Sequence, residues 1–357
     1  MLRISDFSNQ VGAAHPTIMA HAVPKTSRSP LRKLLGVKII ATGSFVPEQI
    51  VRNEDLAKLG YDADWIRQRT GILERRHAPP EMATSDMAIE ASKRVMESAG
   101  VTAADIDLLL LGTFTPDMPM PATACIVQDR LGIVAPAMDV QAACAGFVYA
   151  MITAMQFVKT GCSQMALVIG ADMNSRVCNP ADKKTYPLFG DGAGAVLLAA
   201  GDEDQGVVSY TLGADGSGAE LLCRPMGGSR LPPSAEAMRD NLHFLRMDGR
   251  PVFKWAIRLL HDTITDVLDH AGVTIDEIDA VIFHQANKRI IEAAAADLNI
   301  PDEKLIINVT RYGNTSAASI PLALDEANEK GLLRRGGLVL LSGFGAGLAW
   351  GTTLLRW

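Results

Sequence analysis

The chain lacks the features that would place it in several large classes of protein. None of its apolar runs approaches the ~18 consecutive residues that a membrane span requires. Its 34 lysines and arginines are outnumbered by 40 aspartates and glutamates, and a net charge of −6 gives no basis for nucleic-acid binding through bulk charge. We therefore expect neither a membrane nor a nucleic acid as a partner.

Cysteine is scarce in these 357 residues, and its spacing is irregular. The five cysteines are odd in number and include no Cys-x-x-Cys pair. A disulfide framework needs an even set of cysteines and a zinc ribbon needs close pairs, so both are excluded. This usage fits a reducing compartment, and we expect a cytoplasmic protein.

The first 36 residues differ in composition from the rest. Five basic residues stand there against Asp6 alone, without the apolar segment of a secretory signal. We interpret residues 1–36 as a disordered leader, or as the product of a start codon placed too early, in preference to a targeting sequence. Ordered chain is expected to begin near Gly36.

Short apolar runs bounded by glycine or aspartate alternate with helical patterns along the remaining chain. Runs of this length are typical of strands that are buried on both faces of a sheet. The alternation predicts an α/β fold in which helices cover the sheets. The expected strands are residues 108–111, 166–169, 195–200, 281–283 and 338–341, and the clearest helices are 85–98 and 252–270.

A duplication is the strongest internal signal. Residues 99–102 are Ala-Gly-Val-Thr, and the same four residues recur 172 positions later at 271–274, with an Ile-Asp pair and an apolar run following in both places. Each copy predicts a helix that ends at Gly, a turn and a buried strand. We predict two similar halves, residues 37–205 and 206–357, that pack together because neither closes a core alone.

Cys144 is the candidate nucleophile. It lies in an Ala-Ala-Cys-Ala-Gly segment, where a strand is expected to turn sharply into a helix. Small neighbours permit a tight turn and close approach of a substrate, and the positive end of a helix dipole favours the reactive thiolate. A buried structural cysteine is the alternative, which we assign to the other four cysteines.

Two polar segments of the second half complete the candidate site. His284 follows a predicted buried strand, and a side chain at that place points into the crevice where α/β proteins bind ligands. Asn314 begins the run Asn-Thr-Ser-Ala-Ala-Ser, which we interpret as the counterpart of the turn at Cys144. Each segment alone also fits a structural histidine or a helix cap. At equivalent edges of related halves, the three residues are expected to converge on one cavity.

Together these motifs resemble one known family. Residues 142–147 (Ala-Ala-Cys-Ala-Gly-Phe), 284–287 (His-Gln-Ala-Asn), 313–319 (Gly-Asn-Thr-Ser-Ala-Ala-Ser) and 345–351 resemble the β-ketoacyl-acyl-carrier-protein synthase III family. The resemblance covers about residues 37–357. It implies a homodimer with the thiolase fold, an α/β architecture of two duplicated βαβ-rich halves packed as an α-β-α-β-α sandwich.

The resemblance also implies a reaction. Cys144 would take an acyl group from acyl-CoA as a thioester, since a thiol is both a good nucleophile and a good leaving group. His284 and Asn314 would stabilise the enolate that forms when a malonyl group on acyl carrier protein loses CO₂. The backbone N–H groups of Cys144 and Ala346 would hold the tetrahedral oxyanion. The product, a 3-oxoacyl-acyl-carrier protein, initiates fatty-acid synthesis. Neither a metal nor a permanently bound cofactor is expected, because decarboxylation supplies the carbanion.

Further residues match substrate-binding positions of the family. Trp65 and Arg69 are four apart on a predicted helix and would enclose the CoA adenine. Asn287 would bond the pantetheine arm of CoA. Lys183 stands near the CoA phosphates where the family usually has Arg, and it keeps the charge without the planar fork of a guanidinium.

The acyl pocket is expected to involve Phe189 and Met120. Met120 stands where close relatives carry a Phe from the neighbouring subunit. Because Met is flexible, it predicts a primer longer than acetyl.

A basic face is expected to dock the acidic carrier protein. Arg250, Lys254 and Arg258 are four apart on a predicted helix, and Arg289 follows His284 closely. Lys254 and Arg289 match basic positions of the family, to which we add Arg250; a solvated charged face is the alternative. Residues 226–243 are interpreted as a surface loop.

Several alternatives stay open at this point. A condensing or acyl-transfer enzyme of a polyketide or other secondary-metabolite pathway would use the same Cys, His and Asn. Thiolases need a second catalytic Cys, and hydroxymethylglutaryl-CoA synthases need a catalytic Glu that the motifs do not place. A plain acyltransferase and a non-enzymatic CoA- or carrier-binding protein are the remaining classes. The full set of three residues favours condensation over both.

Overall fold

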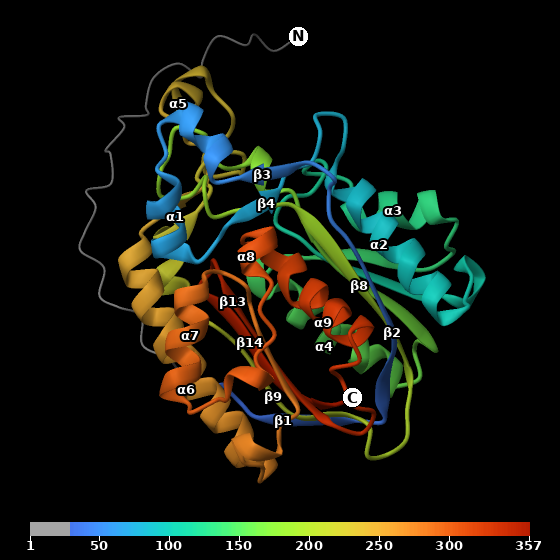
Figure 1. The fold of residues 1–357 in the computed structure, drawn as a ribbon. Coiled ribbons are helices and arrows are strands. Elements are labelled where there is room, and N and C mark those ends of the chain that lie inside the picture. The colour runs from blue at the N-terminus through green and yellow to red at the C-terminus, as the bar shows by residue number, and fades with distance from the viewer. Residues whose placement is uncertain (1–28) are drawn as a thin grey trace, which may run out of the picture.

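Two five-stranded sheets form the frame of the molecule, for which a computed structural model describes residues 29–357 (Figure 1). The first sheet has the strand order β2-β8-β7-β5-β6, and its inner strand β5 is buried at every position. β5 runs parallel to both neighbours, as expected for strands that are covered on both faces. The strands are β2 (Val37–Phe45), β5 (Leu108–Gly112), β6 (Ala137–Val140), β7 (Met165–Asp172) and β8 (Gly192–Ala200).

The second sheet repeats this arrangement, in the order β1-β9-β14-β13-β12. β12 runs parallel to β13 as β5 does to β7, and β13 pairs with β14 in antiparallel fashion as β7 does with β8. Where the first sheet has β6, a single parallel bridge joins Val281 to Leu305. The strands are β1 (Arg32–Leu35), β9 (Gly206–Ala214), β12 (Ala280–Phe283), β13 (Leu338–Gly345) and β14 (Ala349–Arg356).

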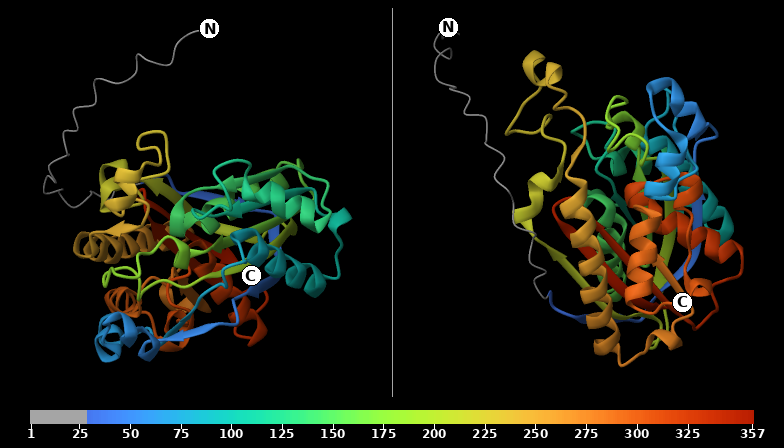
Figure 2. Two further views of the ribbon diagram at one scale, coloured as in Figure 1. Left: turned by 90° about the horizontal axis from the view of Figure 1, so that it is seen from above. Right: turned by 60° about the vertical axis from the view of Figure 1, so that its left-hand side comes forward.

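Helices fill three layers around the two sheets. Leu108 and Leu110 of β5 face the central layer, whereas Leu109 and Leu111 face the outer helices, as the alternation of a strand requires. The α-β-α-β-α sandwich predicted from the sequence is therefore confirmed. The central layer holds α4 (Gly146–Lys159) and α9 (Ser319–Glu329), one outer layer holds α2 (Thr84–Ala99) and α3 (Thr123–Leu131), and the other holds α6 (Gly249–Ala271) and α7 (Lys288–Asp297), which run side by side in Figure 2.

The duplication that the sequence predicts extends to the ends of corresponding helices. α2 and α6 both end at a left-handed glycine, Gly100 with φ +66° and Gly272 with φ +69°. A short 3₁₀ turn follows in each half, with Thr102 and Thr274 at its N-terminus. The same local chemistry thus ends the same helix twice.

Shorter elements complete the described chain, several of them at the upper end of the view in Figure 1. They are β3 (Ile50–Arg52), β4 (Glu74–Arg76), β10 (Leu222–Cys223), β11 (Arg246–Met247), α1 (Ala63–Thr70), α5 (Ala235–Arg239), α8 (Val309–Tyr312) and the 3₁₀ turns η1 (Glu54–Leu59), η2 (Ala103–Asp105), η3 (Ala143–Ala145), η4 (Asn174–Arg176), η5 (Gly216–Leu221), η6 (Ile275–Glu277), η7 (Asp302–Lys304) and η8 (Ser316–Ala318). Across residues 29–357, no helix is both long and apolar enough to cross a bilayer.

Two segments that were predicted to lack regular structure contain short elements in the structure. Residues 1–28 of the expected leader lie outside the described residues, but its last part contains β1, which pairs with β9, forms an edge of the second sheet and buries Leu34. The sheet therefore begins before Gly36. The expected surface loop at 226–243 contains α5, which starts where the Ser234 hydroxyl accepts a hydrogen bond from the backbone N–H of Ala237.

Candidate active site

Cys144, His284 and Asn314 line one cavity of about 290 Å³. Cys144 lies in η3 after β6, His284 follows β12, and Asn314 follows α8. The two halves thus bring the ends of their strands to a shared space, and each half supplies part of the polar lining.

Two similar turns carry the candidate residues. η3 leads into α4 and η8 leads into α9, and each begins with a non-glycine residue of positive φ: Ala143 at +45° and Ser316 at +54°. This backbone region is strained for residues with a Cβ atom, and such strain is characteristic of functional turns. At Gly345, a Cβ atom would lie 2.7 Å from the backbone nitrogen of Cys144, so only glycine lets β13 pass this close.

The Cys144 thiol is buried between the two turns. Its Sγ accepts a hydrogen bond from the Ser316 Oγ at 3.3 Å. Burial raises the pKa of this thiol to about 12, and the charge of the buried Asp172 acts in the same direction. Burial therefore opposes the expected effect of the helix dipole and favours the neutral thiol in the free protein.

His284 is held on three sides. Its backbone N–H donates to the carbonyl oxygen of Ser342 at 2.7 Å, and its Nδ1 lies 2.6 Å from the Ser319 Oγ. The Phe344 ring meets the imidazole edge-on, with 5.3 Å between the ring centroids. Burial lowers the pKa of His284 to about 3, so the ring is neutral at physiological pH.

The Asn314 side chain has a defined orientation. Its Oδ1 accepts a hydrogen bond from the backbone N–H of Ser316 at 2.8 Å, which leaves the amide nitrogen for other partners. Its backbone N–H donates to the carbonyl oxygen of Leu188, and its carbonyl oxygen accepts from the N–H of Gly190. These two bonds fix Phe189, a wall of the cavity, beside Asn314.

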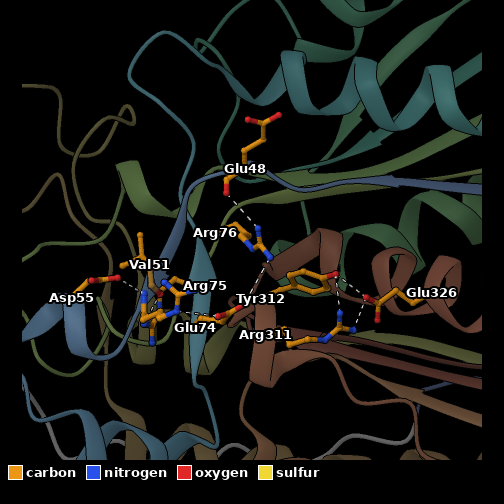
Figure 3. A network of polar contacts seen from close by, with 10 residues as sticks. Glu48, Val51, Asp55, Glu74, Arg75, Arg76, Arg311, Tyr312 and Glu326 are labelled. Atoms are coloured by element: carbon orange, nitrogen blue, oxygen red, sulfur yellow. Dashed lines mark hydrogen bonds and ion pairs between the residues drawn. The ribbon is translucent and has the colours of Figure 1, made fainter.

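A polar clamp holds the segment before Asn314 in place (Figure 3). It consists of Arg76, Arg311, Tyr312 and Glu326. The Tyr312 hydroxyl donates to the carboxylate of Glu326 on α9 at 2.8 Å, and Arg311 pairs with the same carboxylate at 2.7 Å. The guanidinium groups of Arg76 and Arg311 lie over the Tyr312 ring, 5.9 and 4.9 Å from its centroid. The turn at Asn314 is thereby tied both to its own helix and to β4.

Arg75, also drawn in Figure 3, supports the neighbouring part of the wall, which contains Phe189. It is fully buried, and it donates to the carbonyl oxygen of Val51, to the Asn53 Oδ1 and to the carbonyl oxygen of Pro187. Burial lowers the pKa of its guanidinium to about 10. Because Pro187 begins the loop that carries Phe189, this residue links the β3–β4 hairpin to the cavity wall.

The four residues expected to bind CoA all lie on the cavity wall. Trp65 and Arg69 come from α1, and Lys183 lies over the Tyr61 ring at 6.0 Å. The Asn287 amide already makes contacts within the protein: its Oδ1 caps α7, and its Nδ2 donates to the carbonyl oxygen of Arg69 at 3.2 Å.

Other predicted residues lie outside this cavity. Met120 is 83% exposed and does not line the cavity of its own chain. Lys254 lines a separate groove between α6 and α7, and Arg289 lines a third, shared with α1. Arg250 lies in the first turn of α6.

The apolar wall of the cavity was not predicted from the sequence. The side chains share one property, a large apolar area, and they are Leu222, Met247, Val252, Phe253, Trp255, Ile290 and Phe344. The apolar stripe of the helix at 252–270 was a signal for three of them. Within residues 29–357, no group of three or more His, Cys, Asp or Glu side chains is placed to hold a metal ion.

Two duplicated halves in five layers, with a Cys on one half facing a His and an Asn on the other, define the thiolase-fold condensing enzymes. Comparison with known proteins identifies the family within this class. The 3-oxoacyl-[acyl-carrier-protein] synthase III family matches residues 138–216, and the C-terminal part of that family matches residues 268–357.

The chain is 55% identical over 342 residues to the β-ketoacyl-[acyl-carrier-protein] synthase III of Rhodopirellula baltica, covering 91% of this chain and 99% of that protein. It belongs to this family. The crystal structure of the Aquifex aeolicus 3-oxoacyl-[acyl-carrier-protein] synthase III is similar, with TM-score 0.83, 42% identity and coverage of 90% and 100%. The priming β-ketosynthase of the R1128 polyketide pathway is also similar, with TM-score 0.84, 32% identity and coverage of 93% and 98%.

Proposed function

We propose that this enzyme condenses an acyl-CoA primer with malonyl-acyl-carrier protein and releases CO₂, giving a 3-oxoacyl-acyl-carrier protein in the initiating step of fatty-acid synthesis. One observation carries the proposal. A buried thiol from one half and two oriented polar side chains from the other half line a single cavity whose outer wall contains Trp65 and Arg69.

The first half-reaction transfers the primer to Cys144. The Cys144 sulfur forms a bond to the thioester carbon, the bond from that carbon to the CoA sulfur breaks, and the thiol proton leaves with CoA. Since the thiol is neutral at rest, it becomes reactive only as it loses this proton. The backbone N–H groups of Cys144 and Ala346 are the oxyanion donors that we assign, and Gly345 permits the close approach.

The second half-reaction makes the new carbon–carbon bond. Loss of CO₂ from the malonyl thioester leaves an enolate, whose oxygen is stabilised by hydrogen bonds from His284 and Asn314. A neutral His284 suits this task because it donates a hydrogen bond without giving up a proton. The enolate carbon attacks the acyl carbonyl, and the Cys144 sulfur leaves and regains a proton.

Trp65, Arg69, Lys183 and Asn287 hold the CoA substrate in this proposal. Trp65 is 44% exposed, as a residue that stacks on an incoming base should be. CoA is a substrate, and no permanently bound cofactor takes part.

The proposed partners are acyl carrier protein and a second copy of the chain. Lys254 and Arg289 border grooves outside the cavity, where an acidic carrier could deliver its thioester. β6 forms an edge of the first sheet, and Met118, Met120 and Val134 near it are exposed apolar side chains. A second subunit on this edge would cover them and would bring Met120 to its neighbour's acyl pocket beside Phe189.

Intact-mass measurement after separate incubation with acetyl-, isobutyryl- and octanoyl-CoA tests the proposal. We expect one acyl group on the wild type and none on Cys144→Ala, followed by discharge with CO₂ release when malonyl-carrier protein is added. The donor that loads best identifies the primer. Acyl loading without discharge would indicate an acyltransferase, and no loading from any donor would favour a binding protein.

A role in a polyketide or other secondary pathway is the second candidate, because the R1128 priming ketosynthase shares the fold at 32% identity. Primary synthesis predicts that the general fatty-acid carrier protein of the source cell supports turnover. A requirement for a different, dedicated carrier would favour the second candidate.

A further inference from the structure

One turn of the second half contacts all three candidate catalytic residues. In the turn from Asn314 to Ser319, the Ser316 N–H holds the Asn314 Oδ1, and the Ser316 Oγ contacts the Cys144 Sγ. The Ser319 Oγ lies 2.6 Å from Nδ1 of His284. The first two contacts orient groups that face the substrate. The third reaches the far side of the imidazole and has no evident role in the proposed reaction.

The hydrogen bonds around Ser319 define the direction of that third contact. The Ser319 Oγ accepts a hydrogen bond from the backbone N–H of Gln285 at 3.3 Å. Ser319, Gln285 and His284 are buried to 99% or more, and a hydroxyl proton in such a place needs an acceptor. Among the described residues, the acceptor in contact with this hydroxyl is Nδ1 of His284. The hydroxyl therefore donates to Nδ1.

A neutral imidazole carries its one proton on either Nδ1 or Nε2. When Nδ1 accepts a hydrogen bond, it holds a lone pair and the proton is on Nε2. The opposite tautomer would turn the Nε2 lone pair toward the developing enolate oxygen and would repel it. The tautomer thus decides whether this ring assists or opposes decarboxylation.

We propose that Ser319 is a positioning residue that donates its hydroxyl proton to Nδ1 of His284 and holds the ring in the tautomer with its proton on Nε2. The inference rests on the proposed condensing function. The backbone bond to Ser342 fixes the main chain at His284, and the edge contact with Phe344 limits rotation of the ring. The hydroxyl therefore selects only between two proton positions.

The wild-type protein provides the first test. In a ¹⁵N-histidine sample, long-range ¹H–¹⁵N spectra distinguish the two tautomers, and loss of the signal in His284→Gln assigns it. We expect a neutral His284 with its proton on Nε2 from pH 6 to pH 8. A proton on Nδ1 would overturn the proposal.

Separate half-reactions provide the second test. In Ser319→Ala, decarboxylation of malonyl-carrier protein should fall about 10- to 100-fold, since a loosened catalytic group loses rate steeply with misplacement. Acylation of Cys144 should stay within about 3-fold of the wild type, because Ser319 does not contact the thiol. Unchanged decarboxylation, or an equal fall in both half-reactions, would overturn the proposal.

Ser316→Ala is the matched control from the same turn. It removes a serine hydroxyl that contacts the Cys144 Sγ, whereas His284 keeps its partner. We expect the opposite pattern, a change in acylation with the His284 spectrum preserved. A wild type that never decarboxylates the malonyl substrate would refute the proposed function, while the tautomer measurement would still test the Ser319 contact.

Discussion

The two turns at the centre of the molecule share a backbone and differ in chemistry. Both begin at a strained residue, form one 3₁₀ turn and enter a central helix. The first turn, Ala-Cys-Ala, has one polar side chain, and that side chain is hydrogen-bonded by Ser316 of the other turn. The second turn, from Asn314 to Ser319, has an Asn, a Thr and two Ser side chains, and the Asn and both Ser have defined partners.

This difference separates two tasks. The first turn holds a neutral thiol in a setting of small apolar residues, which leaves space for an acyl group. In the proposed reaction, the second turn orients hydrogen-bond donors toward the space where negative charge develops. Duplication supplied two equivalent turns, and side-chain substitution on the same backbone allowed each to take one half of the proposed chemistry.

Cys144→Ala is expected to produce the largest effect. Acyl loading should fall by at least about 10³-fold, because Cys144 is the only cysteine among the described residues that line the cavity. Decarboxylation of the malonyl substrate should persist, since His284 and Asn314 belong to the other half. Mass spectrometry and CO₂ release measure the two steps, and loss of both would show that the tasks are not separable.

Asn314→Ala tests the proposed role of the second turn. Removing one donor to the enolate should slow decarboxylation about 10²- to 10³-fold, as for other oxyanion donors. Acyl loading of Cys144 should change only a few-fold. An equal loss of both activities would mean that Asn314 supports the fold of the turn and not the enolate.

The pH dependence of stability distinguishes the two buried groups, the His284 imidazole and the Cys144 thiol. The pKa of His284 is about 3 in the folded state, below its value of about 6.5 in the unfolded chain. Below pH 6.5 His284 binds a proton in the unfolded state but not in the folded state. The free energy of unfolding therefore falls as pH falls toward 3.

Denaturant unfolding at pH 6.5 and pH 5.0 measures this contribution of His284 to the free energy of unfolding. The free energy of unfolding of the wild type should fall by about 1.7 kcal/mol more than that of His284→Gln over this interval, because the unfolded imidazole is half protonated at pH 6.5 and almost fully protonated at pH 5.0. Cys144→Ala should match the wild type, because a thiol with a raised pKa stays protonated in both states. Identical losses in wild type and His284→Gln would contradict a neutral buried imidazole.

Tyr312→Phe should give the smallest effect. It removes the hydrogen bond to Glu326 and keeps the ring between Arg76 and Arg311. We expect a loss of about 0.5–1.5 kcal/mol in the free energy of unfolding, with acyl loading unchanged. Thermal unfolding and the loading assay test this, and a loading defect would show that the clamp extends to the Cys144 turn.

Local patterns predicted much of the fold. The apolar runs became β5, β7, β8, β12 and β13, and the repeated Ala-Gly-Val-Thr ended α2 and α6 at left-handed glycines. β1 was not predicted because its order depends on pairing with β9, a partner more than 170 positions away. α5 was not predicted because it is a single short helix between prolines and polar residues.

The amino-acid sequence by itself determined the α/β class, the duplication and the identity of Cys144, His284 and Asn314 as candidates, because these depend on residue type and short-range spacing. Tertiary structure alone decided the protonation and orientation of these groups. Burial keeps the thiol and the imidazole neutral, and Ser316 and Ser319 aim the Asn314 amide and the His284 ring. Such properties arise from contacts between distant segments in a medium without water, and a linear pattern does not specify them.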